Sequence, residues 1–298
     1  MIGHMLPILG PIGILVLIGY AMGRGATGLD TRTLSTVVVM VAAPALIFSS
    51  LTSLEITPQA VVAISGAAAL CLAISALLAA LVLKLTGGSL RSFLPVLMMP
   101  NSGNMGLPLV MLAFGDAGRE LAAAYFVVVA LAQHSIGMSI YAGSFKVGTL
   151  LRQPLIYSVL LVVLVLTTGI DVPPVIATTA EMTGGMMVPA MLLLLGTSLA
   201  RLRVADLKSA VVLAFGRLAI GVISAICVIW ILGLEGMPAG VVFLMATMPT
   251  AIVIYVFSER YNRDPERVVG VVVVSTLLTF ACLPGLTWIA LRMAGVAS

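Results

Sequence analysis

Long apolar runs separated by short polar connections dominate the chain. A helix rises about 1.5 Å per residue, so a run of about 20 residues crosses the roughly 30 Å hydrocarbon core of a bilayer. Ten such runs can be drawn, with approximate limits 5–23, 33–54, 60–83, 92–115, 120–141, 153–170, 175–200, 209–232, 239–258 and 267–290. The pattern predicts an all-α integral membrane protein whose residues 1–298 form a single membrane domain of ten helices.

Two of these runs contain residues that the middle of an α-helix does not tolerate. The segment 99–108 (Met-Pro-Asn-Ser-Gly-Asn-Met-Gly-Leu-Pro) holds two prolines, two glycines and two asparagines. Proline lacks an N–H donor and clashes with the preceding turn, and glycine is costly to order. In the ninth run, Met248-Pro249-Thr250 resembles the start of this segment. We therefore expect helices 4 and 9 to be broken. Within a membrane, such non-helical backbone must be buried in protein or line a water-filled cavity.

Basic residues are concentrated in alternate connections. The odd-numbered connections hold Arg24, Arg32, Lys84, Arg91, Lys146, Arg152, Arg201, Arg203, Lys208, Arg260, Arg263 and Arg267. The even-numbered connections hold only Arg119. By the positive-inside rule, the odd connections face the cytoplasm and both termini lie on the outer side. We expect a multi-pass protein of the cytoplasmic (inner) membrane.

The two halves of the sequence repeat a pattern of prolines. Pro44-Ala45 and Pro189-Ala190 precede a Thr-Ser-Leu sequence at the same offset, and Pro100 and Pro249 follow them 56 and 60 residues later. We infer a five-helix unit that occurs twice, with the second copy inverted because it starts on the opposite side of the membrane. The two copies are residues 1–145 and 150–298. Inverted repeats with broken helices at matching positions are a sequence indicator of a mid-membrane transport site.

The chemistry of the breaks favours an anion. Helices that resume at Gly106 and Ala251 would direct their partially positive N-termini at the centre of the membrane. The amide groups of Asn101 and Asn104 would add hydrogen-bond donors there. The residues expected to form or support a substrate-binding site are Asn101, Asn104, Thr250, Pro100, Pro249 and Gly103.

The composition excludes a soluble protein. Apolar residues make up 61% and charged residues 9% of the chain, with a mean hydropathy of +1.22, whereas soluble domains carry about 25% charge. The three cysteines lie in apolar runs without a CxxC pattern, so neither a disulfide framework nor a metal site is indicated. Motifs of intramembrane hydrolases and nucleotide-binding proteins do not occur. We expect no enzyme activity, no cofactor, no metal and no nucleic-acid partner.

Four polar side chains lie inside the apolar runs, and two of them keep two interpretations each. Glu181 is expected either at the membrane interface or as a proton carrier, and Arg217 either reaches the interface or lines an anion pathway. Gln133 and His134 are expected to face different sides of their helix and to make interhelical hydrogen bonds.

Several short motifs, in their order and spacing, resemble the auxin efflux carrier family. They are Gly19-Tyr20-Ala21-Met22-Gly23-Arg24, Pro44-Ala45-Leu46, Pro100-Asn101, Gly106-Leu107-Pro108, Pro189-Ala190-Met191-Leu192-Leu193-Leu194-Leu195-Gly196 and Pro249-Thr250-Ala251. The family includes plant PIN carriers and bacterial malonate-type permeases, within the bile/arsenite/riboflavin transporter superfamily. The resemblance extends over nearly the whole chain.

This resemblance implies a ten-helix inverted repeat similar to the sodium/proton antiporter fold. Helices 1, 2, 6 and 7 would form a scaffold, and crossing helices 4 and 9 would belong to a part that moves like an elevator. The binding residues implied are Asn101 and Thr250, which each follow a crossing proline. Two departures are that plant carriers often have glutamine where Thr250 stands and carry a long loop where this chain has about ten residues.

The sequence and the resemblance together predict a secondary transporter of a small organic anion, such as a malonate-like or auxin-like carboxylate. A sodium-coupled organic-anion symporter of the bile-acid type is the alternative. Membrane lipid is the other expected partner, and the sequence leaves open whether the protein forms a homodimer.

Overall fold

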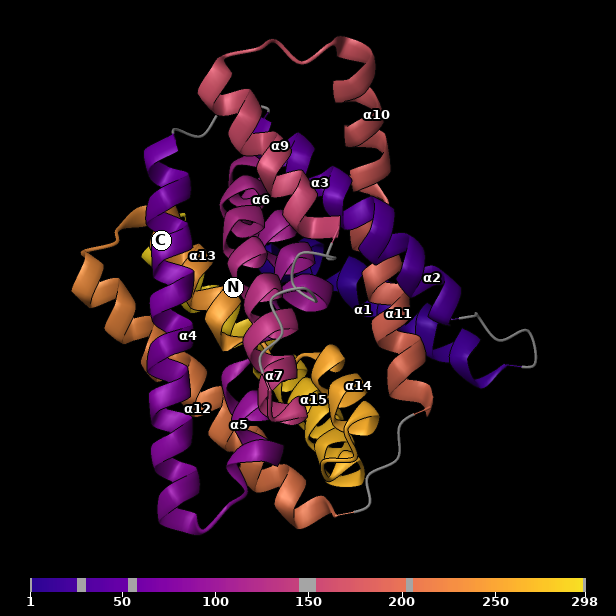
Figure 1. Cartoon of the computed structure of the whole chain (residues 1–298), viewed down its shortest axis with the longest axis vertical. Helices are drawn as coiled ribbons and strands as arrows, with labels where there is room; N and C mark the ends of the chain where they lie inside the picture. Colours follow the sequence, from indigo (N-terminus) through magenta and orange to yellow (C-terminus); the bar gives the residue numbers. More distant parts are fainter. Residues whose placement is uncertain (1, 26–30, 53–57, 145–153, 202–205, 297–298) are drawn as a thin grey trace.

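The computed structural model describes residues 2–25, 31–52, 58–144, 154–201 and 206–296, and this part of the chain is helical (Figure 1). Within this described part, Pro100 and Thr250 form an isolated antiparallel β-bridge. The helices are α1 (Ile2–Arg24), α2 (Thr31–Val37), η1 (Val38–Ala42), α3 (Ala43–Thr52), α4 (Pro58–Thr86), α5 (Leu90–Met98), η2 (Ser102–Gly106), α6 (Leu107–Ala132), η3 (Gln133–Gly137), α7 (Met138–Ala142), α9 (Pro154–Thr168), α10 (Pro174–Gly185), α11 (Met187–Arg201), α12 (Leu207–Leu232), α13 (Gly236–Thr247), α14 (Ile252–Arg260) and α15 (Pro265–Met293); the η segments are π-helical.

Helices coincide with the apolar runs of the sequence. Within the described residues, six helical stretches are long and apolar enough to cross a membrane. They are Thr33–Thr52, Gln59–Thr86, Ser102–Ala142, Pro174–Thr197, Leu207–Leu232 and Pro265–Met293, and shorter apolar helices lie at Leu9–Arg24, Ile156–Val165 and Gly236–Thr247. Large apolar side chains on their outer faces are exposed, such as Trp230 (83%) and Val175 (79%). The protein is therefore a multi-pass, all-helical membrane protein.

Gly115 divides the longest of these stretches. Its backbone has φ 67° and ψ −153°, a conformation that glycine adopts far more readily than other residues. The resulting kink inside α6 separates the end of the run 92–115 from the run 120–141.

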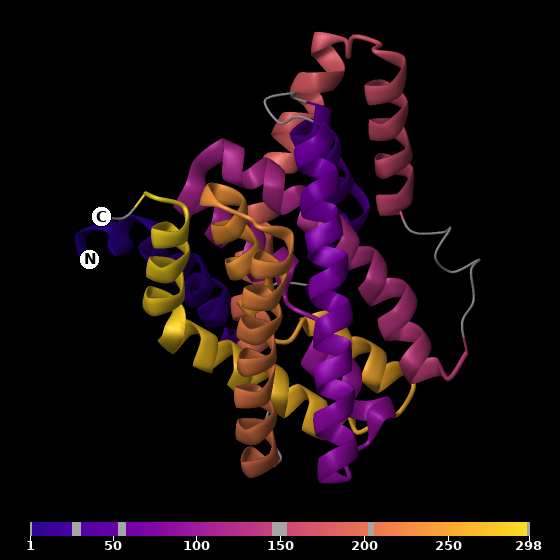
Figure 2. The ribbon, with the colours of Figure 1, turned by 90° about the vertical axis from the view of Figure 1, so that its left-hand side faces the viewer.

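The helices form two groups; α2, α10 and α11 of the first lie at the right of Figure 1, and α4 and α12 of the second lie at its left. In the first group, α1 and α2 pack along α11, and α3 packs against η1, α9 and α10. In the second group, α4, α5, α6, α12, α13 and α15 pack against one another, with η2 and η3 beside α6 and α14 beside α15. Figure 2 shows α4 and α12 as long neighbouring helices of the second group. They are antiparallel, because the end of α4 and the start of α12 line one surface hollow.

Backbone contact between α1 and α11 holds the first group together. A Cβ atom on Gly19 would lie 2.3 Å from the Leu193 carbonyl oxygen, and one on Gly196 would lie 2.0 Å from the Val16 carbonyl oxygen. The Thr197 hydroxyl donates to the Gly19 carbonyl at 3.0 Å. Small residues at such a helix–helix contact let the backbones approach closely, and this close packing is a main source of helix association in membranes.

We expect Gly196→Ala to destabilise the protein, because its methyl group forces α1 and α11 apart. Overpacking of this kind costs about 1–3 kcal/mol. The control is Gly13→Ala in α1, where a Cβ atom meets nothing within 4 Å. Thermal unfolding of the purified protein in detergent should show a lower Tm for Gly196→Ala alone, and equal Tm values for the two variants would contradict the packing argument.

Candidate functional site

Helices α5 and α13 each end in the middle of an apolar run. The non-helical residues are 99–101 in the first run and 248–251 in the second. In the first run, helical structure resumes at Ser102, earlier than the predicted Gly106. The reason is that the Asn101 carbonyl accepts the Gly106 N–H at 3.2 Å and so closes the wider turn of a π-helix.

The two interruptions pair with each other as a short antiparallel ladder. The Asn101 N–H donates to the Pro249 carbonyl at 2.7 Å, and the Ala251 N–H donates to the Met99 carbonyl at 3.1 Å. Segments from opposite halves of the sequence thus satisfy backbone groups that the ending helices leave open. We call this pairing of residues 99–101 with 248–251 the crossing.

Side chains satisfy further backbone groups of the crossing. The Val96 carbonyl would bond the residue at position 100 in a helix, but Pro100 has no N–H, and the Thr250 hydroxyl donates to it instead at 2.9 Å. The Pro100 carbonyl accepts from the Gln133 amide at 2.8 Å. The Thr250 N–H donates to the Ser275 hydroxyl at 3.3 Å. The expected interhelical hydrogen bond of Gln133 is thereby confirmed.

Arg217 of α12 binds the ends of both interrupted helices. Its Nη2 donates to the Ala246 carbonyl at 2.7 Å, and its Nη1 donates to the Leu97 carbonyl at 3.4 Å. With 1% of its surface exposed, Arg217 is one of two buried charged side chains in the described chain; the other is Glu120. Arg217 therefore does not reach the membrane interface, contrary to one interpretation of its sequence position, and it is absent from the described wall of the cavity that follows. That it lines an anion pathway stays a prediction.

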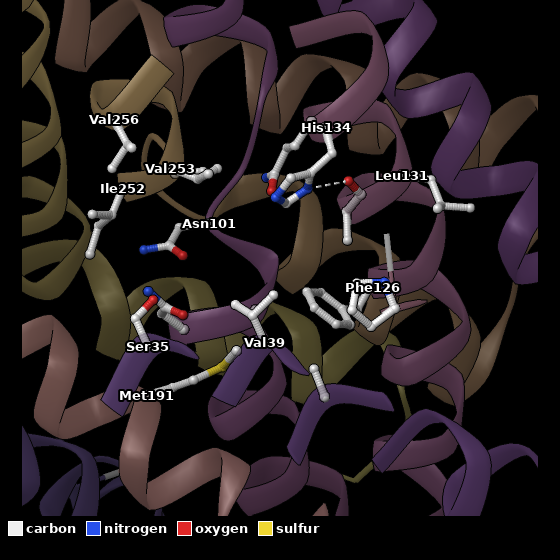
Figure 3. A pocket seen from close by; sticks show the side chains of 17 residues that line it. Ser35, Val39, Asn101, Phe126, Leu131, His134, Met191, Ile252, Val253 and Val256 are labelled. Atoms are coloured by element: carbon white, nitrogen blue, oxygen red, sulfur yellow. Dashed lines mark hydrogen bonds between the residues drawn. The ribbon is translucent and has the colours of Figure 1, made fainter. Parts of the chain in front are cut away.

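A cavity of about 350 Å³ lies beside the crossing (Figure 3). This volume is typical of a site for a small organic molecule. The first helix group contributes Ser35, Val39, Ala43, Pro154 and Met191 to its wall. The second group contributes residues of the crossing, η2, the end of α6, η3 and the start of α14. The cavity thus lies where the two helix groups meet.

Asn101 presents an unused hydrogen-bond donor to this cavity. The residue is 4% exposed, and its Nδ2 atom has no partner among the described residues. Figure 3 shows its amide projecting into the cavity beside Ile252. A buried donor without a partner costs about 1–3 kcal/mol, so a ligand that offers an acceptor here recovers that free energy.

The residues predicted for the binding site divide between two places. The cavity wall includes Asn101, Gly103 and Asn104. The crossing includes Pro100, Pro249 and Thr250. The hydroxyl of Thr250, which is fully buried, is occupied by a backbone carbonyl and is absent from the cavity wall. Glu181 lies on the exposed surface of α10, away from the cavity wall.

Gln133 and His134 both line the cavity, so the expectation that they face different sides is not met. They begin η3, a π-helical turn of the kind that often occurs at functional sites. The Nδ1 atom of His134 bonds the Ala130 carbonyl at 2.9 Å, and its ring meets Phe257 edge-on with centroids 5.6 Å apart. Among the described residues of the cavity wall, His134 is the one with an ionisable side chain.

Comparison with known proteins identifies the family to which the chain belongs. The profile of a family described as "Membrane transport protein" matches residues 5–147 and 143–287. The chain belongs to this family. An "Uncharacterized transporter" of Methanothermobacter thermautotrophicus (strain Delta H) is 28% identical over 286 residues, which cover 91% of this chain and 93% of that protein. The resemblance to auxin efflux carriers read from the motifs is confirmed, and family membership indicates a transporter rather than an enzyme.

We expect Thr250→Val to lower the stability of this membrane transport protein by about 1–3 kcal/mol, since it leaves the buried Val96 carbonyl without a donor. Thr250→Ser keeps the hydroxyl and serves as the control. Thermal unfolding in detergent should give a lower Tm for the valine variant only. A valine variant as stable as wild type would show that the hydroxyl does not support the crossing.

Proposed function

We propose that this membrane transport protein is a secondary transporter of a small organic anion that binds in the cavity beside the crossing. The observation that carries the proposal is the unpaired Nδ2 donor of Asn101 on the wall of a 350 Å³ cavity. A substrate carboxylate supplies the acceptor that this donor lacks. Asn104, on the same wall, provides a second amide.

Helix geometry supports an anion at this place. The segment η2–α6 starts at Ser102, and α14 starts at Ile252, both directly after the crossing. The partially positive N-terminal ends of these half-helices therefore lie beside the Asn101 amide. Free backbone N–H groups and positive potential at such ends favour bound carboxylates.

The rest of the cavity wall favours a substrate that has one carboxylate and is otherwise apolar. Its described residues include Phe126, Met191, Val253 and Val256, and none of the described wall residues is a lysine or an arginine. A dianion would leave one charge facing apolar side chains, which is costly in a site of low polarity. Of the two acid types that the family resemblance implies, an auxin-like acid thus fits this wall better than a malonate-like one.

The proposed architecture is an inverted repeat of residues 1–145 and 150–298 with ten membrane helices. Its support is that α4 and α12, and α5 and α13, occupy matching positions in the two halves and run antiparallel. The connections around Ser92, Asp206 and Asp264 meet at one end, where Ser92 donates to Asp264 and Arg267 contacts Asp206. These belong to the basic connections assigned to the cytoplasm.

Transport would proceed by movement of the second helix group against the first. The cavity favours this elevator-type exchange because its wall is divided between the groups, so sliding one group changes the side to which the cavity opens. The first group would be the scaffold, anchored by the close contact of α1 with α11.

We expect Asn101→Ala to weaken carboxylate binding at least about tenfold, because a hydrogen bond to a charged group contributes about 1.5–3 kcal/mol. Ser102→Ala is the matched control, since Ser102 is also buried with an unpaired hydroxyl in the described chain but lies off the cavity wall. Uptake of indole-3-acetate and malonate into proteoliposomes measures the effect. Equal losses in both variants, or transport of no carboxylate by wild type, would contradict the proposal.

Substrate currents should persist when choline replaces sodium. Carboxylate side chains are absent from the described wall of the cavity, and an anion moving alone is driven by the membrane potential at about 2.3 kcal/mol per 100 mV. Loss of current on this replacement would support the sodium-coupled alternative of the bile-acid type. Currents that require a pH gradient and vanish in His134→Gln would assign the coupling to protons at His134, in place of Glu181.

A further inference from the structure

Arg217 occupies a position that in other carriers suits a metal cation. Both α5 and α13 reach the crossing with their C-terminal ends, where unpaired carbonyls give partial negative charge. Carbonyl oxygens at the ends of interrupted membrane helices are typical ligands of transported or coupling cations. Here the guanidinium of Arg217 lies against both ends, bonded to the carbonyls of Leu97 and Ala246.

The two carbonyls are equivalent in the two halves of the sequence. Leu97 lies three residues before Pro100, and Ala246 lies three residues before Pro249. In a continuous helix, each carbonyl would accept the N–H of the residue four positions later. Here the Asn101 N–H donates to the Pro249 carbonyl instead, and the Thr250 N–H donates to the Ser275 hydroxyl. Arg217 therefore satisfies a matched pair of carbonyls that the crossing itself leaves open.

The positive charge of Arg217 has no carboxylate partner in the described part of the chain. The ion pairs there, Arg119–Asp116 and Arg267–Asp206, do not involve it. The titratable side chains near its guanidinium are Tyr125 and Cys71, which are uncharged at pH 7 at their ordinary values. The negative ends of α5 and α13 are thus the groups that compensate this buried cation.

The approach of α12 fixes the guanidinium against these carbonyls. Gly221 lies one turn after Arg217, and a Cβ atom there would be 2.5 Å from the Ala246 carbonyl and 3.1 Å from Nη1 of Arg217. The backbones of α12 and α13 therefore touch at this point. Arginine stays protonated in proteins, so the charge is permanent as well as fixed.

We propose that Arg217 is a built-in cation that takes the place of a bound metal ion at the crossing, and that its removal opens a site for sodium. In Arg217→Ser the carbonyls of Leu97 and Ala246 would face the volume that the guanidinium leaves, with the new hydroxyl as a further oxygen ligand. Hard cations such as sodium prefer oxygen ligands of this kind. The inference rests on the crossing and not on the identity of the transported substrate.

The test is sodium binding to the purified protein in detergent, measured with radioactive sodium and by Tm in sodium against choline. Wild type and Arg217→Lys, which keep a cation, should bind no sodium saturably and show equal Tm values in both salts. Arg217→Ser should bind about one sodium ion per chain. Its Tm should rise by roughly 5 °C when sodium reaches about a hundredfold excess over its Kd.

Two results would overturn the inference. One is a folded Arg217→Ser protein that neither binds sodium nor gains Tm from it. The other is saturable sodium binding by wild type, which overturns the inference whether or not Arg217→Ser accumulates. Because no substrate is used, a failure here is distinct from a failure of the proposed anion transport, which the Asn101→Ala experiment tests.

Discussion

The structure depends on one constraint, which is that backbone N–H and C=O groups in a membrane must find partners within the protein. Two helices that stop halfway release such groups in the region where water is least able to bond them. The crossing pairs some of them with each other, and the side chains of Thr250, Gln133, Ser275 and Arg217 take up others. Thr250 belongs to the crossing itself, and Gln133, Ser275 and Arg217 come from helices η3, α15 and α12. The broken segments and the helices around them therefore form one unit.

Within that unit, the hydrogen-bond partners distinguish a side chain that supports the structure from one that is available to a ligand. Thr250 and Asn101 occupy matching positions after the crossing prolines, and both are buried. The hydroxyl of Thr250 is used by the protein, whereas the amide nitrogen of Asn101 remains available at the cavity. The two positions that follow the crossing prolines therefore differ, since the hydroxyl of Thr250 closes the structure and the amide of Asn101 faces the cavity.

Sequence patterns were sufficient to predict apolar membrane helices, the two interruptions and the position of Asn101 beside them, because hydrophobic length and proline placement act locally. They did not reveal that Arg217 binds Leu97 and Ala246, since this contact joins residues far apart in the chain. A lone arginine in an apolar run suggests the interface until the helix ends beside it are known. A boundary near Gly115 was predicted between the runs 92–115 and 120–141, but its form as a kink inside one helix was not, since a φ of 67° is one of several conformations open to glycine.

The crossing also separates charge in a way that bears on transport. The C-terminal ends of α5 and α13 lie on the side of Arg217, and the N-terminal ends of the segments that follow lie on the side of Asn101 and the cavity. If the carbonyl ends were left uncompensated, their negative potential would oppose an anion only a few residues away. A permanent cation behind the crossing would remove this opposition without placing a charged side chain on the described wall of the cavity. Under the proposed function, a carboxylate would bind through the amides and the helix ends, and it would leave without breaking an ion pair to the described cavity wall.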